Sequence, residues 1–251
     1  MNKIYVDTGH RPYYIYITKE SWHPFIEHLQ QCIHSKKLLV ICDENVHRLY
    51  YPSLNHILNE YDYEHSVAVI PPGETTKSLK WAEELYTAAL NAKLDRQSAI
   101  VALGGGVVGD ISGFIAATYM RGIDFVQIPT TLLAQIDSSI GGKVAVNHFA
   151  AKNIIGTFYQ PATVYINIDT LKTLPEREFI SGLAELIKYG YIWDHEFLNW
   201  IIDNIDSILA QDIEALQCAI YRACKIKSHI VSMDETEQGI RAILNFGHTI
   251  G

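Results

Sequence analysis

The sequence predicts an α/β fold in which an N-terminal domain built on a parallel sheet is followed by an all-α C-terminal domain. Short apolar runs alternate with helical patterns over roughly the first two thirds of the chain, which is typical of βαβ units. A run of glycines follows one predicted strand and opens the next predicted helix. After residues 162–167 the patterns are helical only.

The predicted strands are short and apolar, and they end at turn residues. KLLVICD at residues 37–43 predicts the first strand, and HSVAVI at 65–70 predicts a second, closed by Pro71 and Pro72. The other strands are predicted at 98–103, 125–128 and 162–167.

Helices are predicted between these strands. Residues 78–92 predict an amphipathic helix, because apolar side chains recur every three or four positions from Leu79 onward. Another helix is predicted through residues 49–58, and further helices after the glycine run and after Thr130.

The helical domain is predicted to follow a boundary near residue 173, which gives an α/β domain at 1–173 and an α-helical domain at 174–251. Pro175 precedes one helical pattern and Ile213 opens another. The last residues, LNFGHTIG, lie in an apolar helical pattern with no capping signal. We therefore expect the helical domain to be incomplete and the chain to be truncated at its C-terminus.

Composition excludes several classes of protein. The net charge is −8 with acids and bases interspersed, whereas a nucleic-acid-binding protein needs a clustered basic face. No apolar run reaches membrane-spanning length, and the N-terminus has no signal-peptide pattern, so we expect a cytoplasmic protein without membrane partners. The four cysteines lack paired spacing and predict buried free thiols in a reducing compartment.

The glycine run is a candidate dinucleotide site. Residues 104–106 and Gly109 satisfy GxGxxG between a strand and a helix, which would make the sheet domain Rossmann-like. The acid expected after the following strand is absent, but Asp43 ends an upstream strand and Asn45 follows it. Taken alone, the run could be a turn needed only for close packing, but the neighbouring PPGETTK at 71–77 favours a nucleotide.

The stretch TTLLAQIDSSIGGK at residues 130–143 predicts a ligand-binding wall. Hydroxyls and free backbone N–H groups at Thr130 and Thr131 can cap a helix and hold an anion. Asp137 and Ser138 follow near the end of that helix, ahead of two glycines and Lys143. So many small polar groups would make a poor core.

Charged residues in the helical part each allow two interpretations. Glu185 and Lys188 could form a solvent-exposed ion pair, although their surroundings are small and apolar. Lys227 lies on an apolar stripe, so it must either extend to solvent or meet an anion in a cleft. His248 could be a core histidine or a metal ligand beside a carboxylate such as Glu185.

Four motifs in order carry a family resemblance: VALGGGVVGD (101–110), TTLLAQIDSSIGGK (130–143), SGLAELIKYG (181–190) and LNFGHTIG (244–251). From about Asp43 to its last residue the chain resembles the 3-dehydroquinate synthases. These are NAD- and metal-dependent lyases of the shikimate pathway, which supplies aromatic amino acid biosynthesis. The metal implied is zinc or cobalt.

The resemblance assigns roles to individual residues. The implied NAD contacts are Asp43, Asn45, Glu74, Lys77, Gly105, Gly106, Val107, Asp110, Thr130, Thr131, Asp137, Ser138, Lys143, Lys152, Thr173 and Leu174. The implied catalytic and substrate-binding residues are Arg121, Lys143, Lys152, Asn153, Lys188, Lys227, Arg241 and Asn245. Glu185 and His248 are the implied metal ligands, and a third ligand would lie beyond Gly251.

The implied reaction converts 3-deoxy-D-arabino-heptulosonate 7-phosphate to 3-dehydroquinate and phosphate, through transient oxidation by NAD, phosphate elimination, re-reduction and aldol closure. The implied assembly is a homodimer, in which Arg121 reaches the neighbouring subunit's phosphate site. The alternatives are another sugar-phosphate cyclase, a metal-dependent polyol dehydrogenase of related fold, and a binding module without catalysis.

Overall fold

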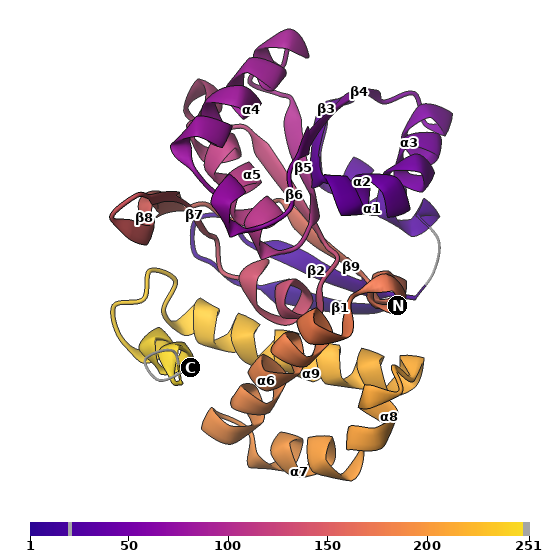
Figure 1. The fold of residues 1–251 in the computed structure, drawn as a ribbon, viewed down its shortest axis with the longest axis vertical. Helices are drawn as coiled ribbons and strands as arrows, with labels where there is room; N and C mark the ends of the chain where they lie inside the picture. The colour runs from indigo at the N-terminus through magenta and orange to yellow at the C-terminus, as the bar shows by residue number, and fades with distance from the viewer. Residues whose placement is uncertain (20–21, 248–251) are drawn as a thin grey trace.

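A computed structural model describes residues 1–19 and 22–247 and contains a seven-stranded sheet in the order β1-β2-β9-β6-β5-β3-β4 (Figure 1). Neighbouring strands run parallel except β1, which pairs antiparallel with β2. The strands are β1 (Asn2–Val6), β2 (Tyr13–Thr18), β3 (Lys37–Asp43), β4 (Glu64–Ile70), β5 (Ala99–Gly104), β6 (Asp124–Pro129) and β9 (Thr163–Asn167). The predicted parallel sheet is confirmed.

Helices cover both faces of this sheet, as a parallel sheet requires. In β3, Leu38 and Val40 face one core and Leu39 and Ile41 face the other, because successive side chains of a strand alternate. α1 (His23–Cys32), α2 (Glu44–Leu49) and α3 (Tyr51–Glu60) contribute to the first core. α4 (Leu79–Asn91) and α5 (Gly106–Thr118) contribute to the second.

A third core joins the sheet to the helices that follow it. α6 (Glu176–Ile192), α7 (His195–Asp203), α8 (Ile205–Leu209) and α9 (Ile213–Met233) lie below the sheet in Figure 1. Their apolar side chains pack against β1, β2 and β9, and α9 runs beneath β1. The fold class is confirmed, while the predicted boundary at residue 173 stays a prediction.

Two strand pairs were not predicted. β1 and β2 lie at the sheet edge, where Lys3 and Tyr5 alternate with buried Ile4 and Val6, so the apolar signal is weak. β7 (Lys143–His148) and β8 (Ala151–Phe158) form a separate hairpin that projects from the molecule (Figure 1). Nearly every residue of β8 is exposed, so no buried face marks it in the sequence.

Two predicted helices differ from the structure. The helix predicted through residues 49–58 is two helices, which meet at Tyr50, and a proline occupies the first turn of α3. The helical pattern predicted at the chain's end is wrong where it is described: residues 240–245 form a 3₁₀ helix, followed by a turn at Gly247. Residues 248–251 lie outside the described part. None of the described helices is long and apolar enough to cross a membrane.

α6 approaches the backbone of the segment after β6 very closely. A Cβ added at Gly182 would stand 2.7 Å from both the Cβ of Leu132 and the backbone nitrogen of Leu133. A backbone atom cannot move away from an added methyl group as the end of a flexible side chain can. Gly182 therefore fixes how close the helical layer lies to the residues that follow the sheet.

We predict that Gly182→Ala destabilises the protein by about 1–3 kcal/mol, because the added methyl overpacks this contact. Alanine ordinarily stabilises a helix relative to glycine by about 1 kcal/mol, so the expected sign is reversed. Thermal or denaturant unfolding measures the change. Ser181→Ala, at the exposed neighbouring position, is the control and should be neutral or slightly stabilising. A stabilised Gly182→Ala variant would contradict the close approach.

Candidate functional site

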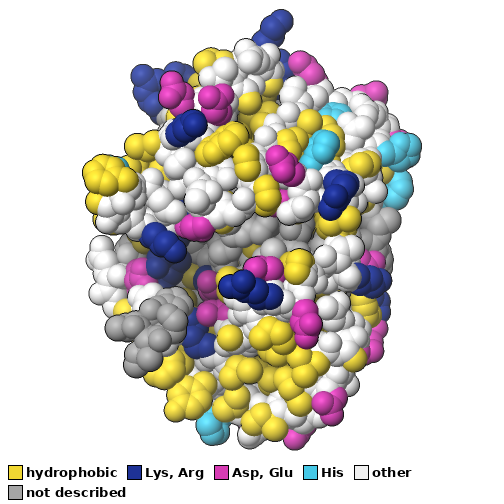
Figure 2. All heavy atoms as spheres, in the orientation of Figure 1, with side chains coloured by type: hydrophobic (Ala, Val, Ile, Leu, Met, Phe, Trp, Pro, Cys, Tyr) yellow, Lys and Arg dark blue, Asp and Glu magenta, His cyan; other side chains and the backbone are white. Residues whose placement is uncertain are grey.

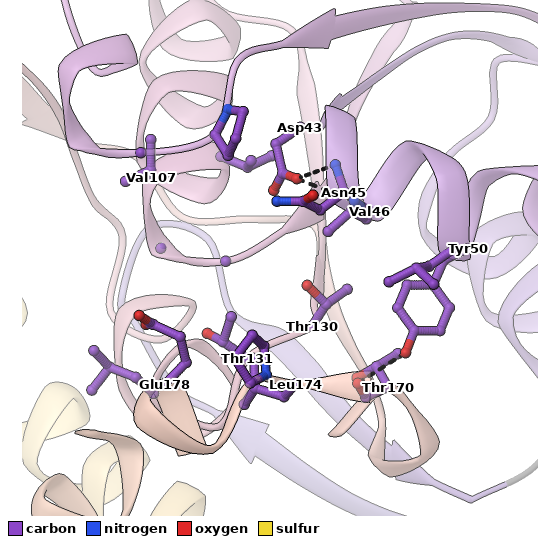
Figure 3. Close-up of a pocket in the computed structure, with 18 of the residues that line it drawn as sticks. Asp43, Asn45, Val46, Tyr50, Val107, Thr130, Thr131, Thr170, Leu174 and Glu178 are labelled. Atoms are coloured by element: carbon purple, nitrogen blue, oxygen red, sulfur yellow. Dashed lines mark hydrogen bonds between the residues drawn. The ribbon is translucent and has the colours of Figure 1, made fainter. Parts of the chain in front are cut away.

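A cavity of about 810 Å³ opens where the parallel strands end. Asp43 ends β3, Pro71 follows β4, and Thr130 follows β6, so the carboxyl ends of these strands converge on one edge of the sheet. Ligands bind at this edge in open α/β sheets. Figure 3 shows Asp43 and Asn45 on one side of the cavity, with Thr130, Thr131 and Leu174 across from them.

The glycine turn brings bare backbone to the cavity. Gly105 is the N-cap of α5 and has no side chain to cap the first helical N–H groups. A Cβ at Gly105 would stand 3.0 Å from the Thr131 side chain, and one at Gly106 would stand 3.0 Å from Ser138 Oγ. A side chain at either position would press on these neighbours, and the bare turn presents free N–H groups and a helix dipole to an anion.

Asp43 is half-buried at the cavity and makes a structural contact. Its Oδ1 accepts hydrogen bonds from the backbone nitrogens of Asn45 at 2.8 Å and Val46 at 3.1 Å, which caps α2. Tyr50 supports the opposite wall, since its hydroxyl donates to the Thr170 carbonyl at 2.9 Å and also contacts Thr173 (Figure 3).

Lys77 and Asp110 connect this first cavity to a second. They form an ion pair, and Lys77 also donates to Asn153 Oδ1 on β8. Asp110 lines both cavities. Burial raises the pKa of the Asp110 carboxyl from 3.8 to about 6, against the opposing charge of Lys77.

The second cavity, of about 790 Å³, lies between the sheet domain, the β7–β8 hairpin and the helical layer. In Figure 2, Lys, Arg, Asp and Glu side chains gather along the boundary between the upper and lower parts of the molecule. The predicted residues that line this second cavity are Asp110, Asp137, Ser138, Lys143, Asn153, Lys227, Arg241 and Asn245. It therefore collects cations and polar groups that lie more than 100 residues apart in sequence.

Asp137 lies on a π-helical segment, Ala134–Ser138, next to this cavity. Such wide turns are rare and occur often at functional sites. Burial opposes ionisation of Asp137, but the charge of Lys227 and hydrogen bonds from Lys227 and Tyr189 outweigh it and lower its pKa. Asp137 is thus held as a carboxylate at the cavity wall.

Lys227 does not extend to solvent. Its side chain is 7% exposed, and its ammonium donates to the Asp137 carbonyl at 2.7 Å and to the Asp137 carboxylate. Burial lowers the Lys227 pKa, and the Asp137 charge opposes this effect. Of the two interpretations of Lys227, the cleft is correct, and its immediate anion is Asp137.

Glu185 and Lys188 form a buried ion pair, not an exposed one. Lys188 Nζ lies 2.6 Å from Glu185 Oε1, and the two side chains are 9% and 10% exposed. Apart from this ion pair, the buried Oε1 has no hydrogen-bond partner within the described residues. Burial and the nearby Asp137 charge raise the Glu185 pKa, so a cation would complement this carboxylate.

Arg241 and Gly141 connect three parts of the chain. Arg241 is buried and donates to the Gly141 carbonyl at 2.9 Å, while the Gly141 N–H donates to the Tyr13 hydroxyl at 3.1 Å. Gly141 has a φ of +94°, and a Cβ there would stand 2.5 Å from the guanidinium. Close by, Glu237 pairs with Lys143 and accepts a hydrogen bond from Asn245 at 2.9 Å.

The structure brings together most of the predicted residues. Twelve of the predicted NAD contacts line the first cavity, and Asp137, Ser138 and Lys143 line the second. Lys152 and Arg121 are exposed and line neither cavity. Lys188 lies behind the second cavity, where it donates to the Leu244 carbonyl at 2.6 Å. His248 lies outside the described residues.

Among the side chains that sequence reasoning missed, Tyr50, Thr170 and Glu237 line these cavities, and Tyr189 is buried beside Asp137. Tyr50 and Thr170 carry no sequence signal, because their role depends on a contact across 120 residues. Tyr189 directly follows Lys188 in ELIKYG, and its helical spacing from Glu185 could have indicated it. Glu237 has a left-handed backbone, with a φ of +58°, that the sequence does not indicate.

The residues present fit a dinucleotide, because uncapped N–H groups and a glycine cradle face a cavity of suitable volume. They also fit one carboxylate ligand of a divalent cation, since the buried Glu185 Oε1 retains acceptor capacity. The described residues contain no group of three His, Cys, Asp or Glu side chains able to hold a metal.

Comparison with known families and proteins gives consistent matches. The model of the 3-dehydroquinate synthase N-terminal family matches residues 67–181, and that of the C-terminal family matches residues 182–251. A 3-dehydroquinate synthase of Desulforamulus reducens is 53% identical over 251 residues, which is all of this chain and 70% of the relative.

Solved structures with the same fold include sugar-phosphate cyclases and also dehydrogenases, such as glycerol dehydrogenase of Schizosaccharomyces pombe, which superposes with a lower TM-score of 0.65 at 15% identity, covering 85% of this chain and 60% of its own. 2-Deoxy-scyllo-inosose synthase, complexed with carbaglucose-6-phosphate, NAD⁺ and Co²⁺, superposes with a TM-score of 0.86 at 26% identity, covering 99% of this chain and 67% of its own. 2-epi-5-epi-valiolone synthase of Streptomyces hygroscopicus subsp. jinggangensis 5008, with NAD⁺ and Zn²⁺ bound, gives 0.86 at 28% identity, covering 96% and 67%.

We predict that Asp110 makes folding stability depend on pH. Its raised pKa means that the folded state binds a proton more tightly than the unfolded state, so stability falls as the pH rises from about 4 to 6. Asp110→Asn should remove this loss of stability, because the amide does not titrate. The difference in unfolding free energy between variant and wild type should therefore grow by about 2–3 kcal/mol between pH 4 and pH 7.

Thermal unfolding of both proteins at several pH values measures the difference. Asp7→Asn, at an exposed position outside both cavities, is the matched control and should give a difference independent of pH. If the difference in unfolding free energy for Asp110→Asn is also independent of pH, burial does not raise the pKa of the Asp110 carboxyl.

Proposed function

Because this chain belongs to the 3-dehydroquinate synthase family, we propose that it converts 3-deoxy-D-arabino-heptulosonate 7-phosphate to 3-dehydroquinate and phosphate. The observation that carries the proposal is the pair of cavities joined at Asp110. One suits a dinucleotide, and the other gathers cations for a small polyanion. The activity is that of a phosphate lyase that also closes a carbocycle.

The first cavity would hold NAD. The N–H groups at the start of α5 and the ammonium of Lys77 would face the pyrophosphate, while Asp43 and Asn45 would contact hydroxyls. Lys152, the one predicted NAD contact outside both cavities, stays a proposal. NAD, when bound, would take up and return a hydride, and a divalent cation on Glu185 would polarise the substrate hydroxyl.

The second cavity would bind the substrate. Lys143, Lys227 and Arg241 line it, and each cation already pairs with an anion or a carbonyl of the chain. These internal partners keep each cation from being buried alone, and the substrate phosphate and carboxylate would bind to the cations in addition to them. Asn153 and Asn245 would supply neutral hydrogen bonds that orient the sugar, and Lys188 would hold the Glu185 carboxylate.

Two features distinguish this activity from its alternatives. Identity to the synthases is about twice the identity to the other sugar-phosphate cyclases, which supports the shikimate-pathway substrate over a secondary-metabolite one. A polyol dehydrogenase would release NADH, whereas a synthase regenerates its cofactor in each turnover. A binding module would have no need for a buried Glu185–Lys188 pair beside Asp137.

We also propose the assembly and the domain division. The protein would act in the cytoplasm as a homodimer, with Arg121 reaching the neighbouring subunit's phosphate. Its exposed position on a turn with a φ of +71° supports this role. Residues 1–173 would form the NAD-binding domain and residues 174–251 part of the metal and substrate domain, with His248 as a further ligand.

The intact protein should release phosphate from the heptulosonate phosphate with catalytic NAD⁺ and no net NADH. The reason is that the hydride removed early in the reaction returns to the substrate before product leaves. A phosphate assay run beside absorbance at 340 nm checks both parts. Stoichiometric production of NADH would show that the protein is a dehydrogenase and not a synthase. NAD binding without turnover would indicate a binding module.

We predict that Glu185→Gln folds normally and binds NAD, but retains little zinc and loses at least about 100-fold in turnover. The neutral amide is a poorer donor to a divalent cation, so the substrate hydroxyl loses its Lewis acid. Elemental analysis measures the metal independently of activity. The control is Glu176→Gln, which removes a carboxylate from an exposed position of the same helix and should change neither value. Wild-type metal content in Glu185→Gln would remove Glu185 from the metal site.

A further inference from the structure

Side chains of α6 and α9 hold three consecutive carbonyls of the π-helical segment. The Gln135 carbonyl accepts from Cys224 at 3.3 Å, the Ile136 carbonyl contacts the Tyr189 hydroxyl at 3.2 Å, and the Asp137 carbonyl accepts from Lys227 at 2.7 Å. Of the three, the Asp137 carbonyl also accepts a backbone hydrogen bond from the Ile140 nitrogen at 2.9 Å. The helical layer thus fixes the part of the backbone that carries Asp137.

Tyr189 does more than hold the backbone. Its side chain is fully buried, and its hydroxyl lies 2.7 Å from Asp137 Oδ1, closer than to the Ile136 carbonyl. Burial and the charge of Asp137 raise the Tyr189 pKa well above its usual value, so the hydroxyl stays a donor. Its single proton therefore goes to the carboxylate.

The carboxylate is held asymmetrically. Both Tyr189 and Lys227 donate to Oδ1, while no hydrogen bond within the described chain reaches Oδ2. Lys227 is flexible along its stem, but the Tyr189 ring is rigid and packed in the core shared by α6, α9 and the sheet. A rigid donor sets the direction of a carboxylate better than a flexible ammonium can.

We propose that Tyr189 is a positioning residue, whose buried hydroxyl fixes the Asp137 carboxylate so that its second oxygen is presented to the substrate cavity. The proposal rests on the proposed function, in which Asp137 belongs to the site. Packing alone does not require the hydroxyl, since phenylalanine would fill the same space. Burying the Tyr189 hydroxyl costs free energy, and the hydrogen bond from this hydroxyl to Asp137 offsets that cost.

Tyr189→Phe tests this role with little change in volume. We expect kcat to fall about tenfold or more, because a hydrogen bond to a charged group is lost, while KM for the sugar phosphate changes less than about threefold. Tyr119→Phe is the matched control: it also removes a buried hydroxyl, which donates to the Leu94 carbonyl at 3.1 Å, and neither residue lines either cavity. It should leave kcat and KM unchanged.

If Tyr189→Phe retains wild-type kcat while wild type is active, the positioning role is overturned and the proposed function stands. If wild type itself shows no turnover, the proposed function fails, and a second measurement still decides whether Tyr189 acts on Asp137. Thermal unfolding of Tyr189→Phe, Asp137→Ala and the double variant gives a cycle that needs no turnover. We expect the double variant to lose less stability than the sum of the two single variants. Additive losses would show that the hydroxyl does not act through Asp137.

Discussion

The contact between the π-helical segment and the two helices α6 and α9 is the constraint on which both cavities depend. Lys227 from α9 and Tyr189 from α6 meet at one residue, Asp137, and Gly182 lets α6 come close enough for this to happen. Without this contact the helical layer would have no fixed position relative to the strand ends. The second cavity therefore forms only where the two layers meet, and neither layer contains it alone.

Charge in the site is balanced before any ligand arrives. Lys77 pairs with Asp110, Lys227 with Asp137, and Lys188 with Glu185. Buried ions of this kind are tolerated only with partners, because desolvation of a lone charge costs several kcal/mol. A ligand that binds here meets groups that are already held in position. This arrangement favours preorganisation over large conformational change.

The sequence predicts the central strands well and the edges poorly. Residues 37–43 are apolar on both faces because both faces are covered, and this continuous pattern is easy to read. In the β7–β8 hairpin, β7 buries Val144 and Val146, but β8 is exposed along nearly its whole length, so no buried face marks β8 as a strand. The glycine turn was predicted because its chemistry is local, with strand, turn and helix adjacent in the chain.

A site residue could be predicted where one segment of the chain supplies both the functional side chain and the residues around it. For Lys227, the sequence left two interpretations open, and only the position of Asp137, 90 residues earlier, decides between them. Tyr189 had a local signal in its helical spacing from Glu185, whereas Glu237 depends on a left-handed backbone that the sequence does not indicate. The π-helical turn is not encoded by any residue type, since its width follows from the helices that pack on it.

The Gly141 peptide group is held by Tyr13 from the beginning of the chain and by Arg241 from near the end of the described part, across sequence separations of 128 and 100 residues. During synthesis Tyr13 leaves the ribosome long before Arg241 does. The sheet can form first, since its strands are complete by residue 167. The wall of the second cavity cannot, because Arg241, which supports it at Gly141, follows α9 in the chain. In the nascent protein, the strands that end at the first cavity can therefore be in place before this wall is complete.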